Sequence, residues 1–181
     1  MKGIIFVTFN KLVEEKFGLD VWDDLLGRVD PQSEGVYVSG DTYEDAELMS
    51  LVGELSKLTG MGIEDLIRAF GEYALEPLAS IYPESINKES MTAKEFLQSV
   101  HDIIHIEVKK LYHDAQLPTI KYEDPAPDQL VMIYQSPRKM YMLAEGLIEG
   151  TAKYFGIQIE RKTIHLTEQG EDIYRFELQF K

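Results

Sequence analysis

The chain has 181 residues, enough for one domain, and its 44% hydrophobic content supports a sizeable core. Its formal net charge of −14, from 32 acidic and 18 basic residues, would repel phosphates and anionic lipids, which argues against nucleic-acid or membrane binding. It contains no cysteine, which excludes disulfides, thiolate zinc sites and cysteine nucleophiles.

The first predicted element is an amphipathic helix. Apolar residues from Ile4 to Phe17 can form one broad stripe, and Gly18 predicts its end. The acidic pair Glu14 and Glu15 interrupts the apolar stretch, and no small-residue cleavage site follows, so the segment does not resemble a secretion signal. With no run of about 18 apolar residues, we expect no membrane span and a cytoplasmic protein.

Two further helices are predicted before residue 60. Asp20 is a candidate N-cap for a short helix reaching Leu26. After a loop, Asp41 or Thr42 is expected to open a helix that Gly60 ends.

Two more helices are predicted before residue 112. Gly62 is expected to open a helical pattern through Leu78 that Tyr82-Pro83 ends, and Pro77 inside it predicts a kink or an early stop. Thr92 is then the expected cap of one long helix ending near Leu111.

After residue 118 the pattern changes from helical to mainly β. Two hairpins and one helix are predicted, namely strands 119–123 and 130–135, a helix over 140–155, and strands 157–166 and 173–180. The predicted fold class is therefore α+β, with a helical N-terminal part followed by a four-stranded antiparallel sheet and a packed helix.

The histidines offer the first candidate site. His101 and His105 are four residues apart on the predicted long helix, so they can share a face. Three interpretations stay open: histidines without a role, a zinc pair that would need further ligands, or a single axial ligand for haem iron. Apolar neighbours suit a porphyrin slot; they are Ile103, Ile104, Ile106 and Val108.

A second candidate site lies at the end of a predicted strand. Tyr134, Ser136 and Arg138 project to one side of an extended chain. Two hydroxyls and a guanidinium can together bind a pair of carboxylates. The alternative is a set of ordinary polar positions before a helix.

Nothing in the sequence makes a positive case for an enzyme. It contains neither a Walker-type phosphate loop nor a G-x-S-x-G nucleophile turn. The alternatives to a haem protein are an acidic protein-interaction module without a cofactor and a metal-dependent hydrolase that uses His101 and His105.

The two candidate sites together resemble the haem-nitric oxide/oxygen binding (H-NOX) family, which includes bacterial stand-alone sensors and the haem domain of soluble guanylate cyclase. The resemblance rests on the stretch from His105 through Tyr112 to Pro118, followed by the Y-x-S-x-R pattern at 134–138. Further similar stretches are MKGIIF, WDDLL, the segment around Phe70, and RKMY with GLIEG after it.

The resemblance implies one H-NOX-like domain over residues 1–181, with a helical subdomain over about 1–60 and a haem-cradling subdomain over about 61–181. It implies that haem b, ferrous iron protoporphyrin IX, is enclosed between the helical part and the sheet. The family places a tyrosine seven positions after the iron ligand, and this spacing selects His105, and not His101, as the iron ligand. The other implied haem contacts are Tyr134, Ser136 and Arg138 at the propionates, and Ile5 and Pro118 against the porphyrin.

The resemblance also implies which gas is bound. The distal-pocket positions hold Phe9, Ala74 and Leu143, whereas oxygen-binding members place a tyrosine where Leu143 lies. Oxygen on ferrous haem acquires negative charge and is stabilised by a nearby donor, so an apolar pocket favours nitric oxide, allows carbon monoxide and disfavours oxygen. Tyr141 would point about 200° away from Leu143 and is not expected to substitute.

The resemblance to stand-alone members implies a regulator that acts in trans on a sensor histidine kinase or a diguanylate cyclase. The sequence-based hypothesis is therefore a nitric oxide sensor in which loosening of the bond between iron and His105 changes the conformation that a partner reads. Some bacterial relatives hold a structural zinc through cysteines, and that site is expected to be absent here.

Overall fold

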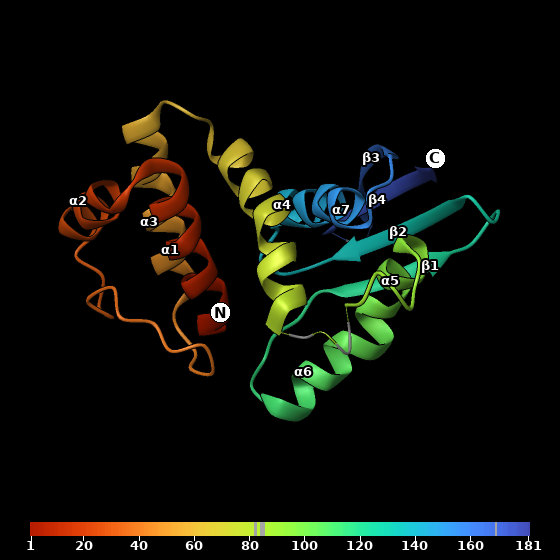
Figure 1. The fold of residues 1–181 in the computed structure, drawn as a ribbon, viewed down its shortest axis with the longest axis horizontal. Helices are drawn as coiled ribbons and strands as arrows, with labels where there is room; N and C mark the ends of the chain where they lie inside the picture. Colours follow the sequence, from red (N-terminus) through yellow and green to blue (C-terminus); the bar gives the residue numbers. More distant parts are fainter. Residues whose placement is uncertain (82, 84–85, 169) are drawn as a thin grey trace.

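The computed structural model describes residues 1–81, 83, 86–168 and 170–181 (Figure 1). The helices are α1 (Gly3–Phe17), α2 (Leu19–Val29), α3 (Asp45–Thr59), α4 (Ile63–Ile81), α5 (Ala93–Ser99), the π-helical segment η1 (Val100–Ile104), α6 (His105–Leu111) and α7 (Tyr141–Phe155). The strands are β1 (Thr119–Glu123), β2 (Gln129–Gln135), β3 (Ile159–Glu168) and β4 (Glu171–Phe180). They form one antiparallel sheet in the order β1-β2-β4-β3, which confirms the predicted α+β class.

Glycines end three of the helices where the sequence predicts. Gly18 follows α1, Gly60 follows α3 and Gly156 follows α7, each with a positive φ. Glycine has no Cβ to oppose this conformation, so it closes a helix at little cost.

The predicted starts of α2 and α3 are wrong. The N-cap of α2 is Gly18, and Asp20 lies in the first turn, where its charge still favours the helix N-terminus. The helix α3 begins at Asp45 and not at Asp41 or Thr42. Residues 41–43 instead form hydrogen bonds and an isolated bridge with the first three residues of the chain.

The next two helices differ in part from the prediction. The helix α4 continues past Pro77 to Ile81, so the predicted early stop does not occur, and Tyr82 of the predicted end lies outside the described residues. The long helix predicted from Thr92 does begin with a Thr92–Glu95 capping box, but η1 interrupts it before His105. A π turn widens the helix locally and is frequent at functional sites.

The sheet packs one face against the helices. Leu130, Met132 and Tyr134 of β2 are buried against residues of α4, α5 and α7. The hairpin β3–β4 extends two residues further toward its turn on each strand than predicted, and β3 begins at Ile159 and not at residue 157. Residues 169–170 join the strands, and residue 169 lies outside the described residues.

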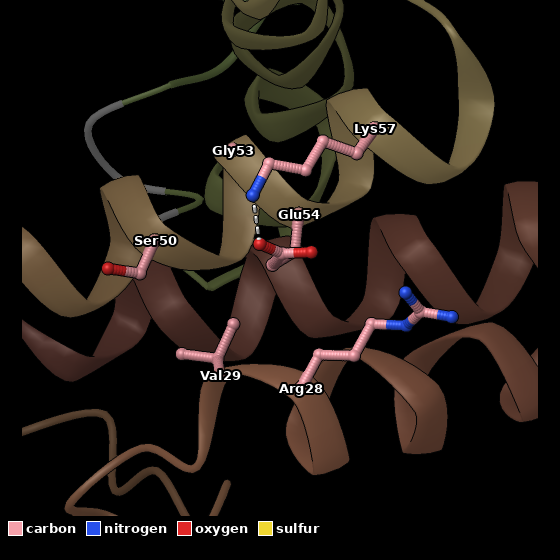
Figure 2. A pocket seen from close by; sticks show the side chains of 6 residues that line it. All are labelled: Arg28, Val29, Ser50, Gly53, Glu54 and Lys57. Carbon is pink, nitrogen blue, oxygen red and sulfur yellow. Dashed lines mark hydrogen bonds and ion pairs between the residues drawn. The ribbon is translucent and has the colours of Figure 1, made fainter.

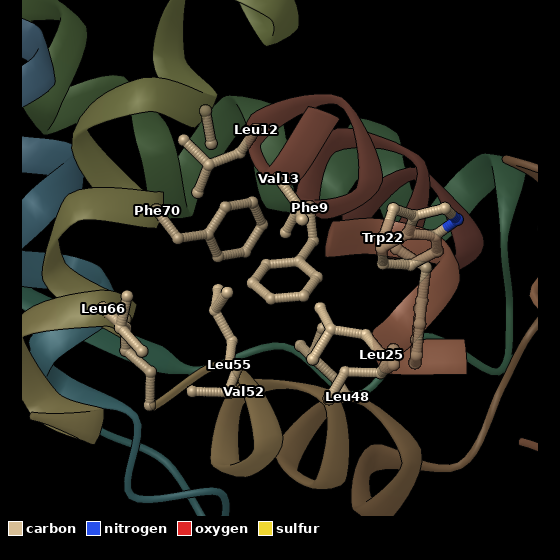
Figure 3. Packing of buried hydrophobic residues seen from close by; sticks show 14 of the residues in the cluster. Phe9, Leu12, Val13, Trp22, Leu25, Leu48, Val52, Leu55, Leu66 and Phe70 are labelled. Carbon is tan, nitrogen blue, oxygen red and sulfur yellow. The ribbon is translucent and has the colours of Figure 1, made fainter. Parts of the chain in front are cut away.

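Two hydrophobic clusters form the interior. The first joins α1, α2, α3 and α4, and Figure 3 shows Phe9 and Phe70 facing each other within it. The second joins α4, α5 and α7 to the sheet. Because α4 contributes to both clusters, it connects the N-terminal helices to the sheet, as its central place in Figure 1 shows. No helix in the described part of the chain is both long and apolar enough to cross a bilayer.

Candidate functional site

The side chain of His105 is the central feature of the candidate site. It is the first residue of α6, directly after the π-helical segment η1. Its ring is largely buried, and among the described residues Nδ1 has no hydrogen-bond partner. Burial first, and then the charges of His101 and Lys109, lower the pKa of His105 to about 4, against the opposing effect of a hydrogen bond with the Pro118 backbone. At neutral pH the imidazole is therefore uncharged, which is the form that binds a metal.

This histidine should make the stability of the haem-free protein depend on pH. Because the folded pKa of His105 is about 4 and the usual value is 6.5, the unfolded chain binds a proton between these values that the folded chain does not. Stability is therefore lost as the pH falls through this window, by about 3 kcal/mol in total. Urea unfolding of wild type and His105→Gln at pH 7 and near pH 4.5 checks this. Wild type should lose more stability than the variant. Equal losses would contradict the lowered pKa of His105 in the folded protein.

The neighbouring histidine faces the sheet. The rings of His101 and His105 are 6.0 Å apart, and the Nδ1 atom of His101 accepts a 3.4 Å hydrogen bond from the backbone N–H of Ile120 in β1. The hydroxyl of Tyr122 accepts a hydrogen bond from the backbone N–H of His101. Over the described ranges, no group of three or more histidine or acidic side chains is placed to hold a metal, so a zinc pair has no third ligand there.

Tyr134, Ser136 and Arg138 lie at the end of β2 and in the turn after it. Tyr134 and Ser136 are buried. Burial raises the pKa of Tyr134, although Ser136 and Arg138 oppose it, so the phenol remains a proton donor at neutral pH. The Ser136 hydroxyl oxygen accepts a 3.3 Å hydrogen bond from the backbone N–H of Arg138, which orients this turn.

Arg138 already binds one carboxylate. Its Nε lies 2.5 Å from Oδ2 of Asp45, and one terminal nitrogen donates to the carbonyl of Gln116 at 2.5 Å. Burial of Asp45 acts to raise its pKa, but the N-terminal ammonium and Arg138 outweigh this, so the pKa is lowered. These contacts use two of the five N–H donors of the guanidinium, which leaves donors for a second carboxylate.

The segment between α6 and β1 connects His105 to Arg138. The carbonyl of Gln116 accepts a hydrogen bond from Arg138, and the Pro118 backbone forms a hydrogen bond with the His105 ring that raises its pKa. β1 then pairs with β2, whose end carries Tyr134. The structure therefore places the two candidate sites on either side of one short segment, although they are about 30 residues apart in sequence.

The predicted distal residues belong to one apolar environment. Phe9 of α1 and Ala74 of α4 are buried in the first hydrophobic cluster, and Ile5 and Leu143 pack against it. Phe9 also contacts Phe70 edge to face, with ring centroids 5.4 Å apart. Every residue of this set is apolar.

Tyr141 lies on the other side of α7 from Leu143. Its ring stacks on Tyr174 of β4, with centroids 4.0 Å apart and an interplanar angle of 10°. This confirms that Tyr141 and Leu143 face different parts of the molecule, as helical geometry predicts for positions two apart.

Sequence reasoning missed Asp45. It precedes Arg138 by 93 residues, and it begins α3, where an acidic residue is common for reasons of helix electrostatics. No local spacing signals this ion pair, because the fold alone brings the start of α3 to the turn after β2.

Two surface hollows lie away from these residues. One, of about 360 Å³, lies between α2 and α3 and is lined by Arg28, Val29, Ser50, Gly53, Glu54 and Lys57 (Figure 2). Its cations are paired locally, Lys57 with Glu54 and Arg28 with Asp24. The other, of about 270 Å³, lies on the outer face of the sheet around Ile133 and Arg175. Neither hollow is lined by a residue of the candidate site.

Known proteins resemble the chain over its whole length. A family model described as Haem-NO-binding matches residues 2–163. The H-NOX protein from K. algicida is 35% identical, with 100% of this chain and 97% of that chain covered and a TM-score of 0.87. The H-NOX protein from S. oneidensis, solved in the Fe(II)NO ligation state, is 32% identical, with 100% and 99% covered and a TM-score of 0.90.

Curated relatives extend the comparison to larger proteins. The soluble guanylate cyclase gcy-35 of Caenorhabditis elegans is 24% identical over 161 residues, which are 84% of this chain and 23% of that protein. The chain thus spans about a quarter of the length of the curated relatives it matches.

The proteins of the matched family are haem-based gas-sensor domains, and this type of domain is not catalytic. The chain belongs to the haem-NO-binding (H-NOX) family.

Proposed function

We propose that this chain is a nitric oxide sensor that carries haem b and holds the iron with His105. The observation that carries the proposal is the His105 ring, which is largely buried, neutral at physiological pH and, in the described part of the chain, without a partner for Nδ1. Such an imidazole suits an axial ligand, since a metal ligand must be deprotonated. Haem, when bound, supplies the iron that binds the gas.

Tyr134, Ser136 and Arg138 are proposed to bind the haem propionates. The ion pair between Arg138 and Asp45 supports this, because one carboxylate already pairs with this guanidinium and further N–H donors are left for a second. Charge-assisted bonds of this kind are roughly twice as strong as neutral ones. Pro118 and Ile5 are proposed to contact the porphyrin from the sheet side and from α1.

Gas selectivity is proposed to follow from the distal residues. Phe9, Ala74 and Leu143 carry no hydrogen-bond donor in their side chains. Nitric oxide depends less on such a donor than oxygen does, so we propose binding of nitric oxide, with carbon monoxide possible and stable oxygen binding disfavoured.

The signal is proposed to pass from α6 to the N-terminal helices. Release of His105 would free α6 and the Pro118 segment, to which Arg138 and Asp45 connect α3. This path joins a helical subdomain over about 1–60 to a haem-cradling subdomain over about 61–181. A sensor histidine kinase or diguanylate cyclase in the cytoplasm is the proposed partner, and the net charge of −14 suits a basic docking surface.

The visible spectrum of the purified protein tests the proposal. We expect a haem band in the ferrous protein that shifts with nitric oxide and with carbon monoxide and does not form a stable oxygen complex in air. A stable oxygen complex would overturn the selectivity but not the cofactor. A colourless protein that takes up no added haem would overturn the function.

A further inference from the structure

A buried carboxylate that the proposed function does not use lies on α7. Glu145 is only 4% exposed. Its Oε2 accepts a 3.1 Å hydrogen bond from Nε of Arg68 of α4, and a terminal nitrogen of Arg68 forms an ion pair with it at 3.0 Å. Its Oε1 pairs with Arg161 of β3 and accepts a 2.5 Å hydrogen bond from the Thr163 hydroxyl. One carboxylate therefore joins a neighbouring helix and the sheet to α7.

This arrangement specifies geometry more than it adds stability. Burying charges is costly, and a buried ion pair is therefore weak evidence for stability, whereas removal of one partner leaves the others uncompensated. Arg161 is held further by Glu149, at 2.8 Å on the next turn of α7. Both guanidiniums are thus fixed in direction by Glu145 and their other acidic partners.

The backbones of α4 and α7 are in direct contact at this point. A Cβ atom added to Gly146 would lie 2.0 Å from the carbonyl oxygen of Arg68, and one added to Gly71 would lie 2.4 Å from the carbonyl oxygen of Leu143. Neither position has room for a methyl group, so the two helices are as close as backbones allow.

The close approach of the two helices reaches the distal residues through Gly71, whose added Cβ would lie 2.4 Å from the carbonyl oxygen of Leu143. Arg68 and Gly71 precede Ala74 by six and three residues on α4, and Glu145 follows Leu143 by two on α7. A change in the separation of α4 and α7 would therefore move Leu143 relative to Ala74, both of which belong to the same apolar cluster.

We propose that Glu145, Arg68 and Arg161 form a positioning clamp that keeps α4 and α7 in contact and thereby limits the size of the ligand admitted beside Ala74 and Leu143. The clamp acts through the helices and touches no ligand. Its effect on ligand size rests on the proposed function.

Glu145→Gln tests the clamp, because it keeps the shape and removes the charge that both arginines share. The probes are carbon monoxide, methyl isocyanide and n-butyl isocyanide, bound to the ferrous holoprotein. In wild type the affinity should fall from methyl to n-butyl isocyanide, and in the variant this ratio should shrink by about tenfold, equivalent to about 1.4 kcal/mol. Carbon monoxide, which is small, should change by less than about threefold.

Glu72→Gln is the matched control. Glu72 also links α4 to α7, through Lys153 at 3.5 Å, but both side chains are exposed, so this variant should keep the wild-type ratio. The proposal is overturned if Glu145→Gln keeps that ratio, or if it lowers only the urea midpoint, as a purely structural role would. If Glu145→Gln does not fold, the test uses Arg161→Lys instead, which keeps the charge but loses the planar guanidinium.

Amide hydrogen exchange tests the clamp independently of haem binding. Amides of α4 and α7 should exchange about tenfold faster in Glu145→Gln than in wild type, with or without haem. If the protein binds no haem, the proposed function fails, and this measurement still decides whether the clamp exists. Unchanged exchange in both helices would overturn it.

Discussion

Replacing His105 with glycine is expected to give a protein that retains haem only when imidazole is supplied. The glycine removes the neutral ring and leaves a space in which free imidazole can bind. Without imidazole, the haem content per chain should fall by about tenfold or more, and with imidazole it should approach that of wild type. The measurement is the ratio of haem absorbance to protein absorbance after gel filtration in each buffer.

His101→Gly is the matched control for that experiment. His101 is one turn earlier and its Nδ1 accepts from the Ile120 N–H, so its loss should leave the haem content near wild type. The ligand assignment is wrong if His105→Gly stays fully loaded without imidazole. A loss of haem in His101→Gly alone would move the ligand to His101.

Leu143→Tyr should convert the protein into one that forms an oxygen complex in air. The phenol would bring a hydrogen-bond donor to the apolar set around Phe9 and Ala74, where oxygen on ferrous haem carries negative charge. A hydrogen bond to a charged group contributes about 1.5–3 kcal/mol, so oxygen affinity should rise by about 10- to 150-fold. Absorbance spectra of the ferrous variant, recorded under argon and then air, measure this.

Tyr141→Phe provides the comparison. Tyr141 stacks on Tyr174 of β4 and does not belong to the distal residues. Loss of its hydroxyl should therefore leave gas binding unchanged. If Leu143→Tyr binds haem and carbon monoxide as wild type does but shows no gain in oxygen affinity, Leu143 does not face the bound gas. An oxygen complex in wild type that disappears in Tyr141→Phe would assign the donor to Tyr141.

The sequence by itself determined the elements whose signals are local. Gly18, Gly60 and Gly156 mark helix ends because each lies in a backbone conformation that favours glycine, and Thr92 caps α5 through a side chain three residues away. The antiparallel strands follow from alternation along the chain. His105 and Arg138 could be named as candidate ligands from their residue types together with the resemblance to the family, and their roles are proposed.

Tertiary structure decided what depends on residues far apart in the chain. Residues 41–43 pair with the N-terminal segment instead of opening α3, and α4 continues through Pro77 where it packs on α7. Arg138 pairs with Asp45, which is 93 residues away, and Glu145 pairs with Arg68, which is 77 residues away. Periodicity reports which face of an element is apolar, but not which charge on another element will neutralise a buried guanidinium or carboxylate. That choice depends on how the helices and the sheet pack, because an ion buried without its partner is too costly to persist.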